Sequence, residues 1–256
     1  MDYGICNLSV VPLRLEPSDT SEMVSQVLLG EHFKVLEIRN KWSKIRLAYD
    51  NYEGWVDNKQ FLLISLEDYE KIDKIPISLS SDIINFGENE QQLLTNIVMG
   101  SHLPFYKEGQ FLIGEEKFIF EGDVISDKQK KENIVTTALQ FLNTPYLWGG
   151  KTPFGIDCSG LTQLVYKLNG YPLKRDAKDQ ATQGDVLSFI EESEPGDLAF
   201  FDNDEGNIIH VGIMMADNYI IHAHGKVRID RLDHLGIYNV DTKRHTHKLR
   251  VIKKII

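Results

Sequence analysis

Residues 7–65 alternate short apolar stretches with polar turns, which is the pattern of β-strands. Turn residues such as Gly30-Glu31 and Asp50-Asn51 separate the stretches. Strands are predicted at Val10–Leu15, Met23–Leu29, Phe33–Ile38, Trp42–Leu47 and Gly54–Val56. Short strands at nearly regular spacing favour a small barrel, which we assign to residues 1–70.

A charged segment, Leu66–Ile75, comes next and is interpreted as a short helix or a linker. Residues 76–123 return to apolar stretches between Gly and Pro turns. Strands are predicted at Ile97–Gly100, Leu103–Tyr106, Phe111–Ile113 and Lys117–Phe120. The pattern indicates a second, less regular barrel over residues 71–125.

A helical pattern replaces the strand pattern after Asp123. Apolar residues at helical spacing predict a helix within Lys128–Asn143, which Thr144-Pro145 ends. A second helix is predicted over Cys158–Leu168, with Asp157 as its N-cap. Its buried stripe is expected to consist of Leu161, Leu164, Val165 and Leu168.

Strands dominate the last part of the chain. They are predicted at Asp197–Phe201, His210–Met215, Tyr219–His222 and Leu249–Ile256. Helices followed by an antiparallel sheet make an α+β domain, which we predict over residues 126–256. The chain of 256 residues is long enough for such a domain and two small barrels.

Composition excludes several classes of protein. The chain is 42% hydrophobic and 26% charged, an ordinary globular composition. Its formal charge of −10 disfavours binding to nucleic acid or to an anionic membrane surface. The two cysteines, Cys6 and Cys158, cannot form a disulfide framework or a cysteine-rich zinc site. We expect no cofactor and no metal, and nothing in the sequence indicates an oligomeric state.

The N-terminal residues Met1–Cys6 lack the basic and apolar regions of a signal peptide. No apolar run approaches the ~20 residues that a membrane span requires. We therefore expect a cytoplasmic protein. The alternative is an exported protein whose signal has been removed.

Cys158 is the candidate nucleophile. A free cysteine is usually a small buried apolar residue, but this one lies in the first turn of a predicted helix. The unpaired N–H groups and the dipole of that turn favour a thiolate. The small neighbours Ser159 and Gly160 leave the sulfur accessible. A thiolate attacks acyl carbons and needs a nearby imidazole that later protonates the leaving amine.

Two of the eight histidines suit this role. His210 begins one predicted strand and His222 ends the next, and the two strands form a hairpin. His224 shares a face with His222 and is the alternative partner of His210. The remaining histidines are interpreted as ordinary surface residues: His32, His102, His234, His245 and His247.

The register of this hairpin decides whether the two imidazoles meet. A two-residue turn at Asp217-Asn218 pairs Ile213 with His222 and puts the histidines on opposite faces. A three- or five-residue loop centred on Ala216 makes His210 and His222 direct cross-strand neighbours. Because only this second register gives a His–His relay, we predict a loop of odd length.

The first barrel resembles a bacterial SH3-like domain. The resemblance rests on the ordered segments Val27–Glu37, Asn40–Arg46 and Tyr52–Val56, the last of which contains a Gly-Trp-Val element. It covers about sixty residues. We interpret the second barrel as a degenerate SH3-like domain.

The α+β domain carries a more specific resemblance, in five ordered motifs. They are Pro145–Gly150, Gly155–Leu161, Gly196–Leu198 with Phe201, His210–Ile213, and Ile221–Ala223. In this order they resemble the NlpC-type cell-wall peptidases, a papain-like family of cysteine peptidases. The resemblance spans about residues 128–256 and implies a triad of Cys158, His210 and His222, whose third member orients the imidazole.

Two SH3-like domains before the peptidase domain, with Arg175-Asp176 and Gln180 after the cysteine, resemble the dipeptidyl-peptidase VI branch. That branch releases L-Ala-γ-D-Glu from free murein peptides by cutting the bond to the following diamino acid. The resemblance implies that Tyr146 lies beside the nucleophile and helps the Cys158 backbone N–H to hold the oxyanion. The alternative interpretation of Tyr146 is a capped loop aromatic.

The candidate substrate-binding residues of this domain are Asp157, Ser159, Trp148 and Asp176. Asp157 has two interpretations, a helix cap and an anion that pairs with a substrate ammonium. Ala177 departs from the branch, which often has Ser at this position, so we expect a hydroxyl contact to a substrate carboxylate to be missing.

Two further candidates for binding a free amine are Glu53 in the first barrel and Tyr69 in the segment that follows it. Their alternative interpretations are a solvated turn charge and a linker aromatic. Barrels that close one end of the cleft would suit short free peptides and a role in recycling. Small murein-derived peptides are therefore the expected partners.

Three other functions compete with a peptidase. Cys158, His210 and His222, with His224, could ligate zinc, although a helix-opening cysteine beside a separate imidazole suits covalent catalysis better. A wall-peptide-binding protein with an inactive catalytic domain conflicts with the intact Cys/His/His set. An amidase or a lipid acyltransferase on the same scaffold is the third, and no apolar membrane-facing element supports the lipid version.

Overall fold

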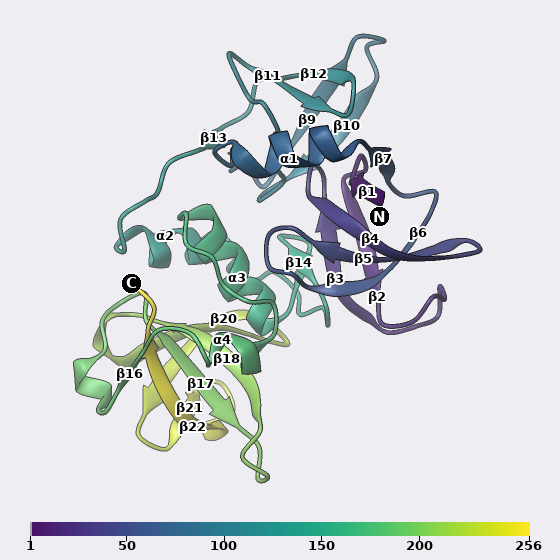
Figure 1. The fold of residues 1–256 in the computed structure, drawn as a ribbon. Helices are drawn as coiled ribbons and strands as arrows, with labels where there is room; N and C mark the ends of the chain where they lie inside the picture. The colour runs from purple at the N-terminus through teal and green to yellow at the C-terminus, as the bar shows by residue number, and fades with distance from the viewer. Residues whose placement is uncertain (1) are drawn as a thin grey trace. The chain divides into compact units, whose positions relative to one another are not determined.

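The computed structural model describes residues 2–256, which form two compact units (Figure 1). Unit 1 ends at Asp127, and unit 2 is Lys128–Ile256. The boundary lies close to the point where the hydrophobic pattern changes from strand-like to helical. None of the helices within residues 2–256 is long and apolar enough to cross a membrane.

Unit 1 begins with an antiparallel seven-stranded sheet in the order β3-β2-β6-β5-β4-β1-β7. Its strands are β1 (Asp2–Ile5), β2 (Val10–Arg14), β3 (Met23–Leu28), β4 (His32–Arg39), β5 (Trp42–Leu47), β6 (Glu53–Asp57) and β7 (Leu62–Ile64). Every strand predicted in this region is present. Strands β1 and β7 were not predicted, because they are too short to show an alternating hydrophobic pattern. Inward side chains of this sheet form a core together with Cys6, which follows β1. The strand residues of this core are Val11, Leu13, Val27, Phe33, Val35, Ile45, Leu47 and Val56.

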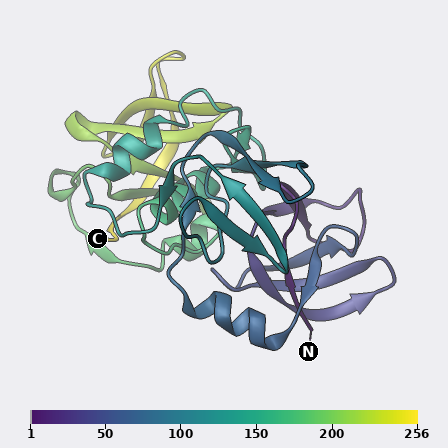
Figure 2. The ribbon, with the colours of Figure 1, turned by 90° about the horizontal axis from the view of Figure 1, so that it is seen from above.

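Helix α1 (Leu66–Lys74) confirms the helical interpretation of the charged segment, and it is the blue helix near the N-terminus in Figure 2. Ser65 caps it by accepting a hydrogen bond from Asp68 N–H at 3.0 Å. Acidic residues occupy its first turn and lysines its last, which complements the helix dipole. Its apolar side buries Tyr69 and Ile72.

The second part of unit 1 is a four-stranded sheet in the order β10-β9-β12-β11, with a short β8–β13 pair. These strands are β8 (Leu79–Ser80), β9 (Ile84–Asn89), β10 (Leu94–Val98), β11 (Gln110–Ile113), β12 (Glu116–Phe120) and β13 (Val124–Ile125). The strand predicted at Leu103–Tyr106 is wrong. Tyr106 N–H donates to the Leu103 carbonyl in a turn, and Phe105 has a φ of 57°.

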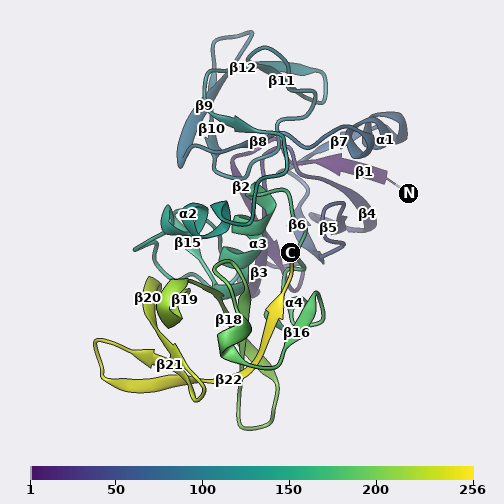
Figure 3. The same cartoon turned by 90° about the vertical axis from the view of Figure 1, so that its left-hand side faces the viewer.

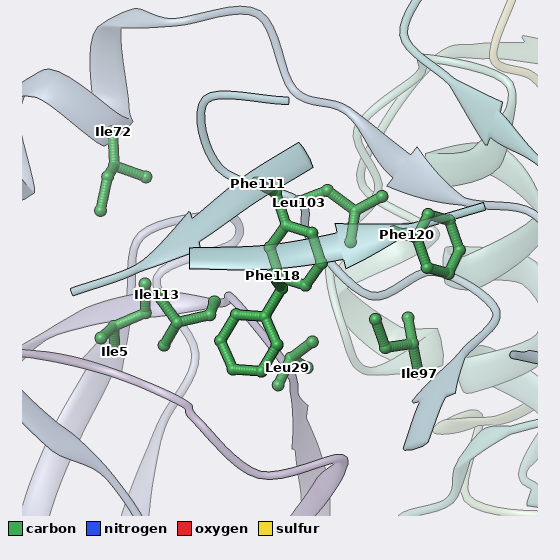
Figure 4. Close-up of a cluster of buried hydrophobic side chains, with 9 residues drawn as sticks. All are labelled: Ile5, Leu29, Ile72, Ile97, Leu103, Phe111, Ile113, Phe118 and Phe120. Atoms are coloured by element: carbon green, nitrogen blue, oxygen red, sulfur yellow. The ribbon is translucent and has the colours of Figure 1, made fainter. Parts of the chain in front are cut away.

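The two parts of unit 1 share a hydrophobic core, which Figure 4 shows. Ile5 and Leu29 from the first part and Ile72 from α1 pack with residues of the second part. Those residues are Ile97, Leu103, Phe111, Ile113, Phe118 and Phe120. Continuous packing of this kind explains why both parts belong to one compact unit.

Gly30 allows close contact between the two parts of unit 1. Its φ is +74°, and a Cβ there would lie 2.2 Å from the His102 carbonyl oxygen. Gly206 in unit 2 has a φ of +81°, and no atom lies within 4 Å of a Cβ built on it.

An alanine at Gly30 or at Gly206 would have to adopt a left-handed backbone conformation, which costs about 1–2 kcal/mol of folding free energy. Gly30→Ala should lower the free energy of unfolding by at least about 2 kcal/mol more than Gly206→Ala does, because the backbone at His102 must move to make room for the new Cβ. Urea unfolding measures both variants, and equal losses would contradict this expectation.

Unit 2 begins with α2 (Asn133–Leu139), which occupies only the middle of the range Lys128–Asn143 in which a helix was predicted. The residues before it are held by the end of the next helix instead, since Gln129 N–H donates to the Asn169 carbonyl. Helix α3 (Cys158–Leu168) has the predicted bounds, and every residue in it is buried, including the predicted stripe. The other short elements are β14 (Lys151–Thr152), β15 (Gly155–Ile156), α4 (Ala177–Gln180) and the 3₁₀ helices η1 (Ile190–Glu192) and η2 (Ala216–Asn218).

The sheet of unit 2 closes on itself. Its order is β16-β22-β17-β18-β19-β20-β21, and β21 also pairs with β22 (Figure 3). Strands β17 to β22 therefore form a closed barrel, and β16 pairs with the C-terminal residues of β22, beyond those that pair with β21. The strands are β16 (Asp185–Leu187), β17 (Leu198–Asp202), β18 (Ile208–Met214), β19 (Tyr219–His224), β20 (Lys226–Asp233), β21 (Gly236–Asn239) and β22 (Arg244–Lys254). Strands β16, β20 and β21 are not among those predicted from the sequence, so closure of the barrel was not predicted either.

Candidate active site

Cys158 is the first residue of α3, which lies against β18 and β19 of the barrel (Figure 1). Asp157 caps the helix as predicted, because its Oδ1 accepts a hydrogen bond from Gly160 N–H at 2.6 Å. Gly160 also permits close packing, since a Cβ there would lie 2.3 Å from the Gly150 carbonyl oxygen. The start of the helix is therefore tightly held, and Cys158 is only 7% exposed.

Burial raises the pKa of the Cys158 thiol to about 12, and the Asp157 carboxylate adds to the effect. Backbone N–H groups of Val211 and Ser159 act in the opposite direction and are outweighed. The Ser159 N–H at the helix start therefore acts in the expected direction, towards the thiolate, but desolvation of the charge is the larger effect. The contact with Val211 N–H places the sulfur against β18, one residue along the strand from His210.

The two predicted histidines meet. His210 Nε2 and His222 Nδ1 are 2.8 Å apart, and both side chains are buried. The connecting loop has the predicted odd length, but its centre is Asp217, one residue later than predicted. Gly212 therefore pairs with His222, and the predicted direct pairing of the two histidines is wrong. As diagonal neighbours on one face of the sheet, they still come within hydrogen-bond distance.

Asp230 extends this pair, although it is not among the site residues predicted from the sequence. His222 Nε2 lies 3.0 Å from Asp230 Oδ2. Arg228 holds the same carboxylate through Nε at 2.7 Å and Nη2 at 2.9 Å, and Val240 N–H donates to it at 3.0 Å. The available signal was the alternation of charged and apolar residues along Lys226–Asp233, which indicates a strand.

His247 also belongs to this site. Its ring stacks on His210, with centroids 4.1 Å apart and planes at 22°. Burial, followed by the neighbouring His222 and His224, lowers the pKa of His247 to about 4. The prediction that His247 is an ordinary surface residue is wrong, because β22 closes the barrel beside β17 and brings it to the site.

Both central imidazoles are neutral near pH 7. Desolvation lowers the pKa of His210 well below its usual value, and neighbouring histidines add to the effect. Burial also lowers the pKa of His222, although Asp230 opposes this. With Cys158 protonated, the thiol and the two imidazoles are all uncharged in the resting protein.

Alkylation of Cys158 should therefore accelerate with pH across the whole range from about pH 6 to about pH 9. Its raised pKa keeps the thiol protonated throughout this range, so the reactive thiolate fraction grows about tenfold per pH unit. The measurement is the rate of iodoacetamide labelling of the Cys158 peptide, by mass spectrometry. Urea-unfolded protein is the control, and its rate should level off near the ordinary thiol pKa. A rate already constant below about pH 7 would indicate a thiolate–imidazolium pair instead.

Asp157, Arg175 and Ser159 form a buried network next to Cys158. Arg175 Nη2 lies 2.6 Å from Asp157 Oδ2, and Nη1 lies 3.0 Å from Asp157 Oδ1 and from Ser159 Oγ. Gly149 N–H donates to Asp157 Oδ2 at 2.9 Å. A substrate ammonium at Asp157 would share oxygens that already accept these bonds. That contact remains a prediction.

The other predicted residues of unit 2 lie on the loops around α3. Tyr146 is half-buried, and its N–H donates to the Gly225 carbonyl at 3.0 Å. Burial raises the pKa of Tyr146, and the nearby Cys158 contributes to this. Trp148 is 61% exposed, and Asp176 precedes α4 without capping it through its side chain. Their roles remain predictions.

Glu53 and Tyr69 lie in unit 1. The Glu53 carboxylate is 2.9 Å from Lys44 Nζ and 2.6 Å from Arg46 Nη2, and the hydrogen bonds from these two cations lower its pKa. Tyr69 is buried on α1, 5.0 Å from His32 between ring centroids. Their substrate-binding roles remain predictions.

Two histidines of unit 1 are buried, contrary to prediction. His32 is 7% exposed and His102 is 6% exposed. Each lies where the two parts of unit 1 meet, since His102 N–H donates to the Leu29 carbonyl and both line a small shared pocket. Their burial follows from the shared core, which the assignment of two separate barrels did not include.

Within residues 2–256, no group of three or more His, Cys, Asp and Glu side chains is arranged to hold a metal ion. Both ring nitrogens of His222 are engaged, one by His210 and the other by Asp230. The zinc alternative requires a nitrogen of His222 for the metal, so this geometry does not support it.

A cysteine at the start of a buried helix, with a histidine on the strand that packs against that helix, is the arrangement found in papain-like cysteine peptidases. A family model described as the NlpC/P60 family matches residues 143–248, and one described as a bacterial dipeptidyl-peptidase SH3 domain matches residues 13–61. The chain belongs to the NlpC/P60 family, and it is a cysteine peptidase with an N-terminal SH3 domain.

Known proteins resemble most of this chain. The gamma-D-glutamyl-L-lysine dipeptidyl-peptidase of Bacillus subtilis is 30% identical over 78% of this chain and 71% of its own. Dipeptidyl-peptidase 6 of Lysinibacillus sphaericus is 28% identical over 86% of this chain and 88% of its own. The crystal structure of an NlpC/P60 family protein from Bacillus cereus covers 99% of both chains with a TM-score of 0.83 and 20% identity. At 20% identity, the similarity to the Bacillus cereus structure shows that the two chains share a fold.

Proposed function

We propose that this enzyme hydrolyses the bond between γ-D-Glu and the following diamino acid in small peptidoglycan-derived peptides. The observation that carries the proposal is Cys158 at the start of a buried helix that packs against β18, the strand of His210, whose Nε2 binds His222. This arrangement suits acyl transfer at a peptide carbonyl. The choice of bond follows the names of the two relatives, gamma-D-glutamyl-L-lysine dipeptidyl-peptidase and dipeptidyl-peptidase 6. The product would be L-Ala-γ-D-Glu, released from free peptides in recycling.

In the proposed reaction, Cys158 attacks the γ-carbonyl carbon of D-Glu while His210 takes the thiol proton. His222 binds Nε2 of His210, so we assign Nδ1 to the thiol. Because the resting thiol is protonated, proton transfer accompanies the attack. The C–N bond then breaks as His210 returns the proton to the leaving amine, and a thioester remains. A water molecule, deprotonated by His210, hydrolyses the thioester and restores the thiol.

We assign the oxyanion to the backbone N–H of Cys158 and the hydroxyl of Tyr146. The raised pKa of Tyr146 supports this role, since the hydroxyl keeps its proton and can donate a hydrogen bond. Candidate substrate contacts in this unit are Asp157, Ser159, Trp148 and Asp176, and those in unit 1 are Glu53 and Tyr69.

Two finer features of the fold belong to the same proposal. The contact of α3 with β18 and β19 supports helices packed on the sheet of a papain-like domain. The four-stranded antiparallel sheet of unit 1 is proposed to be a second, degenerate SH3-like domain.

The test is to incubate L-Ala-γ-D-Glu-diaminopimelate with wild type and with Cys158→Ala and to identify the products by mass. Wild type should release L-Ala-γ-D-Glu, and Cys158→Ala should release none. The N-acetylated peptide distinguishes a dipeptidyl-peptidase, which should not cleave it, from an endopeptidase, which should. Cleavage only between muramic acid and L-Ala in a muramoyl peptide would indicate an amidase instead. Equal cleavage by Cys158→Ala would refute the mechanism.

A further inference from the structure

Asp230 ends a hydrogen-bonded chain that runs from His210 through His222. It is fully buried, and its Oδ2 lies 3.0 Å from His222 Nε2. We propose that Asp230 is a positioning residue that fixes the tautomers of both imidazoles and so makes Nδ1 of His210 the base. The inference rests on the proposed function, in which His210 accepts the proton of Cys158.

The tautomers follow from which atoms can donate. A carboxylate only accepts hydrogen bonds, so the hydrogen between Asp230 and His222 is on His222 Nε2. Neutral His222 then has a bare Nδ1, which can only accept. The hydrogen between the two rings is therefore on His210 Nε2, 2.8 Å away. Neutral His210 is left with a lone pair on Nδ1, so one buried charge sets proton positions two side chains away.

Asp230 remains ionised because donors surround it. Burial acts to raise its pKa, but hydrogen bonds from His222, Arg228 and Val240 N–H lower the pKa of Asp230 to about 2. Arg228 is held in turn by Asp241 at 2.8 Å. The carboxylate is therefore fixed in both charge and orientation.

Asp230→Asn keeps the shape of the side chain and reverses one hydrogen bond. An amide nitrogen at the δ1 position would face two donors, Arg228 Nη2 and Val240 N–H. At the δ2 position it faces one donor, Arg228 Nε, and it can donate to His222 Nε2. The second orientation is favoured, and it forces His222 into the Nδ1–H tautomer. His210 then carries its hydrogen on Nδ1 and cannot take the thiol proton.

Side-chain ¹H–¹⁵N correlation spectra of the full chain, labelled with ¹⁵N-histidine, report these tautomers without substrate. Wild type should show His210 and His222 as Nε2–H, and Asp230→Asn should show both as Nδ1–H. With the diaminopimelate tripeptide, kcat of Asp230→Asn should fall about 10³–10⁴-fold while KM changes little. A purely structural role would not move the tautomers.

Asp233→Asn is the matched control. Asp233 lies on the same strand and pairs with His245 at 2.9 Å on the surface, so its replacement should change neither the two tautomers nor kcat. An Nδ1–H form of His210 in wild type would overturn the proposal, even if Asp230→Asn fails to fold. In folded Asp230→Asn, a change of tautomer without loss of kcat, or the reverse, would also overturn it. If wild type does not cleave the tripeptide, the spectra still test the tautomer assignment, so the two failures are distinguishable.

Discussion

The His210→Gln variant is expected to hydrolyse the γ-D-Glu–diamino acid bond with a kcat/KM about 10⁴–10⁶-fold below that of wild type. Glutamine fills a similar volume but cannot accept the thiol proton at neutral pH. The pKa of the Cys158 thiol is raised to about 12, so almost no thiolate forms without a base. The measurement is steady-state release of L-Ala-γ-D-Glu by the full chain.

His224→Gln is the control for that comparison. His224 is exposed and contacts His222 only through ring stacking, at 6.2 Å between centroids. Its replacement should change kcat/KM less than about threefold, since stacking at this distance moves no proton. Equal losses in the two variants would mean that the base has been assigned to the wrong residue.

Arg175→Met should destabilise unit 2 by about 3–5 kcal/mol, the largest stability effect expected of a single substitution here. Arg175 is 2% exposed, and it is bonded to Asp157 through both Nη atoms and to Ser159 through one. Its loss leaves the Asp157 carboxylate buried without a counter-ion. Hydrogen exchange of α3 peptides across a urea series measures the effect in the full chain.

Arg46→Met provides the matched comparison on the surface. Arg46 also contacts a carboxylate through two nitrogens, at Glu53, but the two side chains are 44% and 32% exposed. Water replaces the lost contact, so the expected cost is about 0–1 kcal/mol. A cost similar to that of Arg175→Met would show that burial does not set the strength of these pairs.

Local signals in the sequence predicted the part of the site that depends on neighbours in the chain. The Asp157 cap, the bounds of α3 and the odd loop between β18 and β19 all follow from residues a few positions apart. Even there, the pairing of His222 was wrong by two positions, because the turn centre depends on a left-handed Asp217, with a φ of 56°.

The remainder of the site was not predicted, for two different reasons. Asp230 meets His222 across the β19–β20 hairpin, only eight residues along the chain, but the local pattern indicates a strand there without indicating its register. His247 reaches His210 only because β22, a distant segment, closes the barrel. The pKa of Cys158 is a further example, since the burial that raises it comes from the packing of α3 on the barrel rather than from the helix start itself.

Closure of the barrel by its last strand has a consequence for the timing of folding. The α3 helix and the β18–β19 hairpin consist of contacts between residues close in sequence, whereas β17 pairs with the much later β22. Contacts of high sequence separation form late. We therefore expect a chain emerging from the ribosome to carry Cys158 and His210 in an open, hydrated arrangement until β22 has been synthesised. Peptidase activity would then appear in one cooperative step, once β22 has left the ribosome and paired with β17.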